Sequence, residues 1–325
     1  MKAFEFQDIY TPLQERDLPR PQPREGQVLI EVKAAGLCHS DCLILRDETY
    51  SMIAQHPIIL GHEVAGTIIE LGPRVSGFQI GENIVSALIS HPISNADLAT
   101  AIGLGYNGGY AEFAIVYTEN IVRIPLGVTF AQAAVAADSI STAYHALITE
   151  ARVNDTSTVC IIGLGGLGVA GIQVVNALTR AKVYGIDINT RKFDAAHRLG
   201  AVQCATNLEE LGHIWFDAIV DFAGAEGIAA AAASAVKAGG RVVLVGIGAT
   251  EITLDPRSLV FKNVAVQGSI GASKSELEQV LQCIADGRLI PVLEEVPFAD
   301  IPRGLERLEK GGVTGRLYVD PSKTA

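Results

Sequence analysis

The sequence predicts an α/β protein in which one domain is built on a doubly wound parallel sheet and a second domain is mostly β. Two observations predict the sheet. Strand-like and helix-like segments alternate from about residue 140 to 270, and a glycine-rich run at 163–168 stands where the first of these strands meets its helix. A third observation predicts the other domain, because residues 1 to about 125 show short strands broken by turn signals.

The expected elements follow from the hydrophobic pattern. Strands of the parallel sheet are expected at 159–162, 182–186, 217–221, 241–245 and 264–267, with right-handed crossovers through helices between them. The clearer strands of the β part are expected at 27–32 and 64–70, a further helix at 273–284 and a last strand at 315–319. We therefore expect a first domain of residues 1–139, completed by 272–325, and a second domain of residues 140–271.

Composition limits the classes of function. The chain has 325 residues, 49% of them hydrophobic, and this is enough for two domains with a core each. The net charge of −11 argues against nucleic acid or an anionic membrane as a partner. No apolar run reaches the roughly 18 residues of a membrane span, and no secretory signal is visible. Five scattered cysteines form no disulfide framework, so we expect a reducing, cytoplasmic location.

The run GLGGLG at 163–168 is typical of a dinucleotide-binding turn, because it lies between a strand-like run and a helix-like segment. Gly163 allows a tight turn, Gly165 lets the backbone approach a pyrophosphate, and Gly168 lets the helix and the strand pack closely. Gly166 and Leu167 open the helix, whose free N–H groups and dipole favour phosphate. We expect a Rossmann-type cofactor site here.

Asp187 follows the next strand and lies 187 − 168 = 19 residues beyond the last glycine of the run. A carboxylate at this position accepts both ribose hydroxyls of the adenosine half and repels a 2′-phosphate, which favours NAD over NADP. Arg191 and Lys192 favour the alternative, since a basic pair can hold a 2′-phosphate; Lys192 could also reach the ribose itself. NAD is our prediction.

Three residues of the first domain could bind a metal. Cys38 and His62 supply a thiolate and an imidazole, and Asp138 lies in an otherwise small, apolar and hydroxylic segment where a buried carboxylate needs a cation or a hydrogen-bond partner. Each has an ordinary alternative. Cys38 alone could be a small buried side chain, His62 a hydrogen-bonded core residue, and Asp138 the cap of a helix that begins near Ser139.

Five segments occur together in one order: GLCHSDC at 36–42, GHEVAGTI at 61–68, GLGGLG, DINTRKF at 187–193 and the terminal GRLYV at 315–319. Together they resemble the zinc-dependent medium-chain alcohol dehydrogenases of the medium-chain dehydrogenase/reductase superfamily, over nearly the whole chain. The resemblance implies a GroES-like catalytic domain and a Rossmann domain that binds NAD.

The resemblance also implies roles at the metal. Catalytic zinc would be bound by Cys38, His62 and Asp138, the last in place of the more usual Cys, as in a subgroup of the family with an acid there. Glu63 would lie beside the zinc, and Ser40 would accept the substrate proton. His39 would lie near the cofactor phosphates.

The other implied roles concern the cofactor and the substrate. Cofactor contacts are implied for Thr142, Lys192, Ile247 and Arg316, with Thr142 at the nicotinamide and Arg316 at a phosphate. Leu88 and Tyr110 align with pocket positions, where ordinary core packing is the alternative.

The chain departs from the family pattern in two ways. Many members hold a structural zinc in a lobe with four cysteines, but no Cys stands between Cys42 and Cys160, so we expect one catalytic zinc per subunit and no structural zinc. Many members also carry a His three residues after the proton-accepting Ser, where this chain has Leu43. The proton would then leave through Ser40, the ribose and water, or by way of His39.

The expected activity is reversible hydride transfer between a primary or secondary alcohol and NAD, giving an aldehyde or ketone. A first alternative is a zinc-free NAD(P)H-dependent double-bond reductase of the same superfamily. A second is a non-catalytic dinucleotide-binding protein. We expect a small-molecule substrate and a homodimer or homotetramer.

Overall fold

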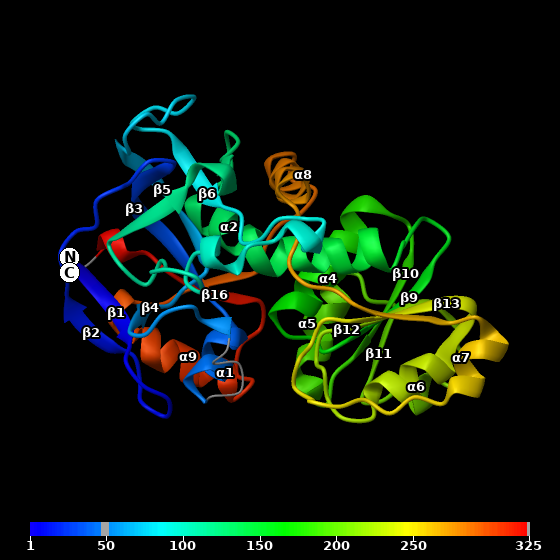
Figure 1. Ribbon diagram of the computed structural model, residues 1–325. Coiled ribbons are helices and arrows are strands. Elements are labelled where there is room, and N and C mark those ends of the chain that lie inside the picture. Colours follow the sequence, from blue (N-terminus) through cyan, green and yellow to red (C-terminus); the bar gives the residue numbers. More distant parts are fainter. Residues whose placement is uncertain (47–51, 324–325) are drawn as a thin grey trace. The chain divides into compact units, whose positions relative to one another are not determined.

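Residues 1–46 and 52–323 are described here from a computed structural model (Figure 1). The chain divides into two compact units, the first made of Met1–Ser141 and Ala272–Ala325, the second of Thr142–Gly271. The second unit has a parallel sheet covered by helices, and the first is dominated by antiparallel strands. The predicted α/β class with its two kinds of domain is confirmed.

The second unit contains a six-stranded sheet in the order β11-β10-β9-β12-β13-β14, in which every pairing is parallel. This is the strand order of a dinucleotide-binding Rossmann sheet. Its strands are β9 (Thr158–Ile162), β10 (Lys182–Ile186), β11 (Gln203–Ala205), β12 (Phe216–Asp221), β13 (Val236–Leu244) and β14 (Ala265–Gly268). Four of the five expected strands agree within a residue or two. β13 begins five residues earlier than expected, and β11 was not predicted.

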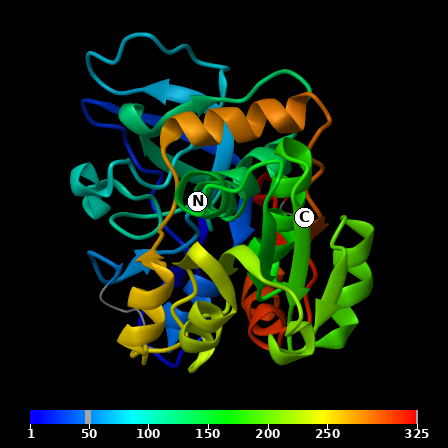
Figure 2. The same ribbon diagram turned by 90° about the vertical axis from the view of Figure 1, so that its right-hand side faces the viewer.

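Helices cover both faces of this sheet because its central strands are apolar on both sides. These helices are α4 (Gly166–Leu178), α5 (Phe193–Arg198), α6 (Ile228–Ala235) and α7 (Pro256–Lys262). Along β9, Val159 and Ile161 pack with residues of α4 and α5, whereas Cys160 and Ile162 pack with α6 and α7. Figures 1 and 2 show α6 and α7, in yellow, side by side.

The first unit is built around β3, a long strand that pairs with β5, β7 and β16. Its larger sheet has the path β15-β16-β3-β5-β6-β8, and a small sheet has the order β2-β1-β4. The strands are β1 (Lys2–Phe6), β2 (Gln14–Asp17), β3 (Gln27–Leu37), β4 (Ile58–Ile59), β5 (Glu63–Leu71), β6 (Asn83–Ser86), β7 (Phe113–Tyr117), β8 (Ile121–Arg123), β15 (Leu293–Glu295) and β16 (Arg316–Val319). The strands expected at 27–32, 64–70 and 315–319 are therefore present.

The helices of the first unit include four that the hydrophobic pattern did not predict. The helices are α1 (His39–Leu45), α2 (Phe130–Val135), α3 (Ser141–Tyr144, which ends in the second unit), α8 (Lys274–Ala285) and α9 (Ile301–Glu309). Only α8 was expected, and it begins after the N-cap Ser273 in a capping box with Glu276. Figure 2 shows α8 in orange; it contacts β8 and the π-helical turn η5 (Ala136–Ile140).

Shorter turns complete the elements. They are the π-helical η6 (His145–Glu150) and the 3₁₀ turns η2 (Ile93–Asn95), η3 (Leu98–Thr100), η4 (Thr118–Asn120), η7 (Thr190–Lys192), η8 (Glu209–Leu211), η9 (Phe298–Asp300) and η10 (Pro321–Lys323). No helix in residues 1–46 and 52–323 is both long and apolar enough to cross a membrane.

Candidate metal centre and dinucleotide site

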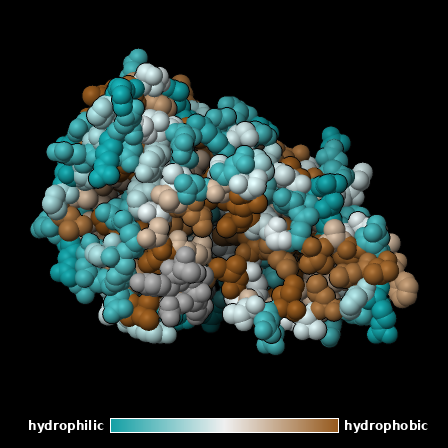
Figure 3. Space-filling model, viewed as in Figure 1, coloured by the Kyte–Doolittle hydropathy of each residue, from teal (hydrophilic) through white to brown (hydrophobic). Residues whose placement is uncertain are grey.

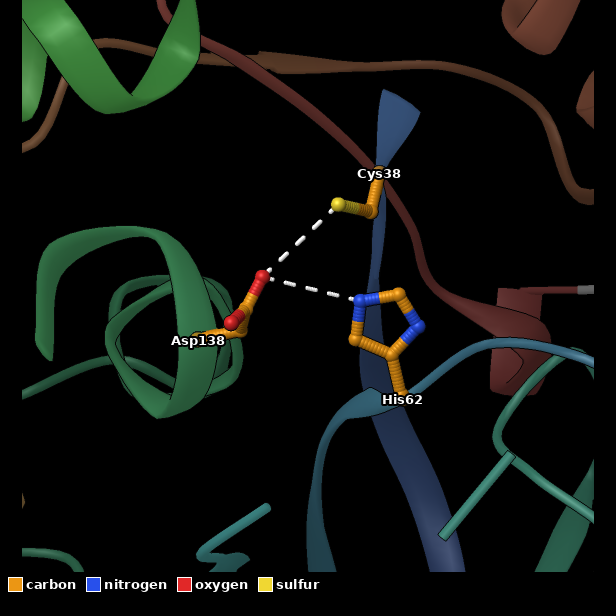
Figure 4. Close-up of side chains that lie close together, drawn as sticks. All are labelled: Cys38, His62 and Asp138. Atoms are coloured by element: carbon orange, nitrogen blue, oxygen red, sulfur yellow. Dashed lines mark hydrogen bonds and ion pairs between the residues drawn. The ribbon is translucent and has the colours of Figure 1, made fainter. Parts of the chain in front are cut away.

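Cys38, His62 and Asp138 converge in the first unit, although 100 residues separate the first from the last (Figure 4). Asp138 Oδ2 lies 3.7 Å from Cys38 Sγ and 3.6 Å from His62 Nε2, and the three ligand atoms all lie within 4.8 Å of one another. Ligands at about 2.0–2.3 Å from a tetrahedral zinc lie about 3.3–3.8 Å apart. The two distances to Asp138 therefore match the edges of a zinc tetrahedron, and all three side chains could hold one ion.

Local structure explains how each ligand is presented. Cys38 is the N-cap of α1 directly after β3, and His62 stands directly before β5, the strand that pairs with β3. Asp138 lies in η5, between α2 and α3, and its side chain points toward the other two (Figure 4). The alternative that Asp138 caps a helix is wrong, since the backbone is helical on both sides of it. Single π-helical turns inside a helix are frequent at functional sites.

The ligand set lies in an anionic environment. Burial by itself lowers the pKa of His62, but the electrostatic effect of Asp41 and Cys38, together with hydrogen bonding to Asp138 and Asp41, outweighs burial and raises the pKa well above its usual range. Surroundings that favour a proton on the imidazole also favour a divalent cation beside it. Among the described residues, this is the one group of three metal-binding side chains.

Glu63 and Arg316 form a buried ion pair next to the ligands. Arg316 Nη2 donates to Glu63 Oε1 at 2.7 Å and lies 3.3 Å from Cys38 Sγ and 3.4 Å from Asp138 Oδ2. Burial raises the pKa of Glu63, and Arg316 opposes that rise without cancelling it. Gly36 makes room for the pair, because a Cβ there would lie 1.8 Å from Glu63 Oε2. The phosphate contact expected of Arg316 stays a prediction; its contacts here are with the metal-binding cluster.

The residues expected to handle the substrate and its proton lie around the same ligands. Ser40 Oγ is 3.4 Å from His62 Nε2, so its hydroxyl faces the metal-binding side of the imidazole. His39 is exposed at the start of α1, and Leu43 is half-buried on the same helix. Leu88 is half-buried against the core of the first unit.

Tyr110 is fully buried, and its hydroxyl donates to Asp41 Oδ2 at 2.6 Å. No surface of its side chain is left for a substrate. The structure therefore corrects the expectation of a pocket residue and favours the alternative that Tyr110 belongs to the core.

Asp41 is a functional residue that sequence reasoning missed. Its Oδ1 lies 3.4 Å from His62 Nδ1, and its Oδ2 accepts from the backbone N–H of Cys38 at 3.1 Å. A carboxylate behind a metal-binding His fixes the ring and its tautomer. The available signal was the acid three residues after Cys38, the spacing of a capping box.

In the second unit, the glycine run joins β9 to α4 as expected. Gly163 has φ +88°, and a Cβ on Gly168 would lie 1.9 Å from the carbonyl oxygen of Gly163, so both positions require glycine. A Cβ on Gly165 would meet nothing within 4 Å, which leaves open space in front of the helix N-terminus. Gly166 and Leu167 form the first turn of α4.

Asp187 stands at the carboxyl end of β10, beside this turn, where its side chain is held by three donors. Oδ2 accepts from Leu164 N and from Lys192 Nζ, both at 2.8 Å, and Oδ1 accepts from Asn189 N at 2.8 Å. Lys192 therefore lies beside the expected ribose acceptor. Arg191 is exposed.

The remaining expected cofactor residues are also placed in the second unit. Thr142 is buried, and Ile247 is 53% exposed after β13. An apolar side chain with that exposure at the carboxyl edge of a parallel sheet is available to a flat ring.

A Rossmann sheet with an acid after its second strand, in a chain that also carries a converging Cys–His–carboxylate trio, is typical of a metal-binding dinucleotide oxidoreductase. Comparison with known proteins specifies the family. Residues 24–126 match the alcohol dehydrogenase GroES-like domain, and residues 166–286 match the zinc-binding dehydrogenase domain.

Individual relatives match over almost their whole length. An alcohol dehydrogenase of Geobacillus stearothermophilus is 28% identical over 98% of this chain and 99% of its own. The acetophenone reductase of Geotrichum candidum, solved with NAD, has a TM-score of 0.88 at 28% identity, covering 99% of this chain and 98% of that one. A cobalt- and zinc-bound alcohol dehydrogenase of Pyrobaculum aerophilum has a TM-score of 0.86 at 26% identity over 99% of both chains.

The chain belongs to the zinc-type medium-chain dehydrogenase/reductase family, and its Cys–His–Asp group is compatible with the subgroup that uses an Asp ligand.

Proposed function

We propose that this protein is a zinc-dependent alcohol dehydrogenase that transfers a hydride reversibly between a primary or secondary alcohol and NAD, giving an aldehyde or ketone. The observation that carries the proposal is the convergence of the Cys38, His62 and Asp138 ligand atoms, which all lie within 4.8 Å of one another. A three-ligand zinc site leaves one position open, which is typical of catalytic rather than structural zinc.

When bound, zinc supplies Lewis acidity, which lowers the pKa of an alcohol and polarises a carbonyl. The residues of this chain supply the proton path. Ser40 Oγ, beside His62 Nε2, is placed to accept the hydroxyl proton of an alcohol. Leu43 has no titratable group to continue a relay, so the proton accepted by Ser40 would leave by way of the exposed His39, or through the ribose of a bound cofactor and water.

Two other functions differ from this one in what they require of the site. A zinc-free double-bond reductase has no use for three converging side chains that could hold a metal, so the convergence of Cys38, His62 and Asp138 supports the dehydrogenase over this alternative. A non-catalytic dinucleotide-binding protein would tolerate the replacement of one or more of these three side chains. The intact ligand spacing therefore favours the dehydrogenase.

The direct test combines metal analysis with an assay. We expect one zinc per chain, in agreement with the absence of a Cys lobe between Cys42 and Cys160, together with NAD reduction by members of a panel of primary and secondary alcohols. Two zinc ions per chain would contradict the single-zinc proposal. No metal after gentle purification, or no NAD reduction by any alcohol, would contradict the dehydrogenase.

We also propose that NAD is preferred over NADP, because the buried Asp187 carboxylate would repel a 2′-phosphate. Replacing Asp187 by Gly is expected to narrow or invert the preference, measured as the ratio of kcat/KM values for the two cofactors. Removing a repulsion of roughly 1–3 kcal/mol changes the ratio about 5–150-fold. The change also frees Lys192 Nζ, now 2.8 Å from Asp187, to meet a 2′-phosphate.

Asp194→Asn is the matched control, since it removes a nearby exposed negative charge and should leave the ratio unchanged. Equal kcat/KM values of the parent protein for NAD and NADP would contradict the proposal. They would show that the positive charges of Arg191 and Lys192 compensate for the repulsion of a 2′-phosphate by Asp187.

We propose that the protein forms a homodimer or homotetramer through the edge of the parallel sheet. β14 is the end strand in the sheet order, and α7 before it presents Val260 and Phe261 at 73% and 84% exposure. Figure 3 shows apolar surface gathered where α6 and α7 lie in Figure 1. An edge strand beside exposed apolar side chains is a template for a second copy.

Replacing Phe261 by Glu is expected to shift the protein to a monomer in analytical ultracentrifugation, because it places a charge in the apolar patch beside β14. Leu126→Glu is the control, a fully exposed Leu in the first unit, and should leave the sedimentation coefficient unchanged. Identical sedimentation of both variants and the parent protein would contradict an interface at α7.

A further inference from the structure

A line of buried polar groups extends from His62 away from the metal-binding atoms. His62 Nε2 faces Asp138, and Nδ1 on the other side of the ring lies 3.4 Å from Asp41 Oδ1. Neither Nδ1 nor Oδ1 has a closer hydrogen-bond partner among the described residues, and both atoms are buried, so each is the available partner of the other. The orientation of the Asp41 carboxylate therefore decides how firmly the ring is held.

That orientation is set at the other carboxylate oxygen. Asp41 Oδ2 accepts from two donors, the backbone N–H of Cys38 at 3.1 Å and the hydroxyl of Tyr110 at 2.6 Å. The carboxylate is completely buried, so its orientation depends on these donors rather than on bulk solvent. Two donors on Oδ2 fix the rotation of the carboxylate and leave Oδ1 directed at His62.

The fold holds the Tyr110 hydroxyl firmly in place. The backbone N–H of Tyr110 donates to the carbonyl oxygen of Leu60, two residues before His62, and its carbonyl accepts from Phe4 N. The ring fills the space beside Gly61, where a Cβ would lie 2.6 Å from the ring. Both the backbone and the ring of Tyr110 are therefore held against the segment that carries His62.

From this geometry we propose that Tyr110 is a positioning residue for the metal ligand His62, and that it acts through Asp41. Tyr110 itself contacts neither the substrate nor the atoms of Cys38, His62 and Asp138 that would bind the metal. By fixing the carboxylate, its hydroxyl holds the imidazole with Nε2 toward Cys38 and Asp138, so the ligand set needs less reordering when zinc binds. This inference rests on the zinc site proposed above.

Tyr110→Phe tests the proposal, because phenylalanine keeps the ring beside Gly61 and removes only the hydroxyl. We expect the dissociation constant for zinc, measured by chelator competition, to rise roughly tenfold. This is the low end of the roughly 10–100-fold loss for partners behind metal ligands. The absorption spectrum of the Co²⁺-loaded protein should also change, since it reports the geometry of the ligands.

Tyr106→Phe is the matched control. Tyr106 is a largely buried tyrosine of the same unit whose ring packs edge to face on Tyr117 with a centroid separation of 5.2 Å. It should leave both the zinc affinity and the Co²⁺ spectrum as they are in the parent protein. Thermal unfolding of the metal-free proteins, followed by circular dichroism, separates metal affinity from general stability.

A third variant tests the route through Asp41. Asp41→Asn should weaken zinc binding at least as much as Tyr110→Phe, and adding Tyr110→Phe to it should have little further effect. Zinc affinity in Tyr110→Phe no weaker than in Tyr106→Phe would overturn the proposal. So would an unchanged affinity in Asp41→Asn, a result that does not depend on the Tyr110 variant being folded.

These measurements distinguish a failure of the inference about Tyr110 from a failure of the proposed zinc site. A parent protein that binds neither zinc nor Co²⁺ would overturn the metal site and this inference together. A parent protein that binds zinc, with variants that match it, would overturn only the role of Tyr110.

Discussion

Replacing Cys38 by Ser is expected to lower kcat/KM for alcohol oxidation at least about a thousandfold and to remove zinc from the protein. A serine hydroxyl stays protonated near neutral pH and is a poor zinc ligand, whereas a thiolate is a strong one. The Lewis acidity that is lost contributes several kcal/mol to the transition state, and each 1.36 kcal/mol is a factor of ten in rate. The measurements are zinc content and steady-state kinetics.

The same variant should keep its affinity for NAD, measured by titration calorimetry. Cys38 belongs to the first unit, whereas Asp187 and the glycine run belong to the second. Cys204→Ser, a half-buried cysteine of the second unit, is the control and should retain zinc and activity. A Cys38→Ser protein that retains both zinc and activity would remove Cys38 from the ligand set.

Replacing Arg316 by Met is expected to destabilise the metal-free protein by about 3–5 kcal/mol, the usual cost of leaving a buried charge without its partner. The side chains of Arg316 and Glu63 are 4% and 0% exposed, and the guanidinium also lies 3.3 Å from Cys38 Sγ and 3.4 Å from Asp138 Oδ2. The free energy of unfolding in urea, followed by circular dichroism at fixed protein concentration, measures the loss.

Two further variants identify why Arg316→Met lowers the free energy of unfolding. Combining Arg316→Met with Glu63→Gln removes both charges and should recover much of the stability, because the uncompensated carboxylate is then gone. Arg307→Met breaks the exposed pair with Glu294 and should cost no more than about 1 kcal/mol. If Arg316→Met costs as little as Arg307→Met, the buried pair does not stabilise the first unit.

The parallel sheet could be predicted closely from the sequence because its signals are local. A strand, the turn at 163–168 and a helix follow one another in the chain, and each side chain or glycine acts on its immediate neighbours. The helices α1, α2 and α9 were not predicted. α1 and α2 have only seven and six residues, too few for a clear helical period, whereas α9 does carry a start signal, Asp300 followed by a proline in the first turn, that the hydrophobic pattern did not register.

The metal ligands were predictable only in part. Cys38 and His62 belong to short motifs, but Asp138 is distant from both in the sequence, and residue spacing alone left it open as a helix cap. The structure rejects the cap, because the π-helical turn keeps the backbone helical and directs the carboxylate to the other two ligands.

The sequence by itself determined the class of the fold, the turn for the dinucleotide and the acid that follows it, since all of these depend on neighbours along the chain. The tertiary structure alone decided which groups surround the ligands. Arg316 meets Glu63 across 253 residues and Tyr110 meets Asp41 across 69. Such contacts depend on how β3, β5 and β16 pair, and on a glycine at position 36 that leaves space for a carboxylate; no local pattern encodes them.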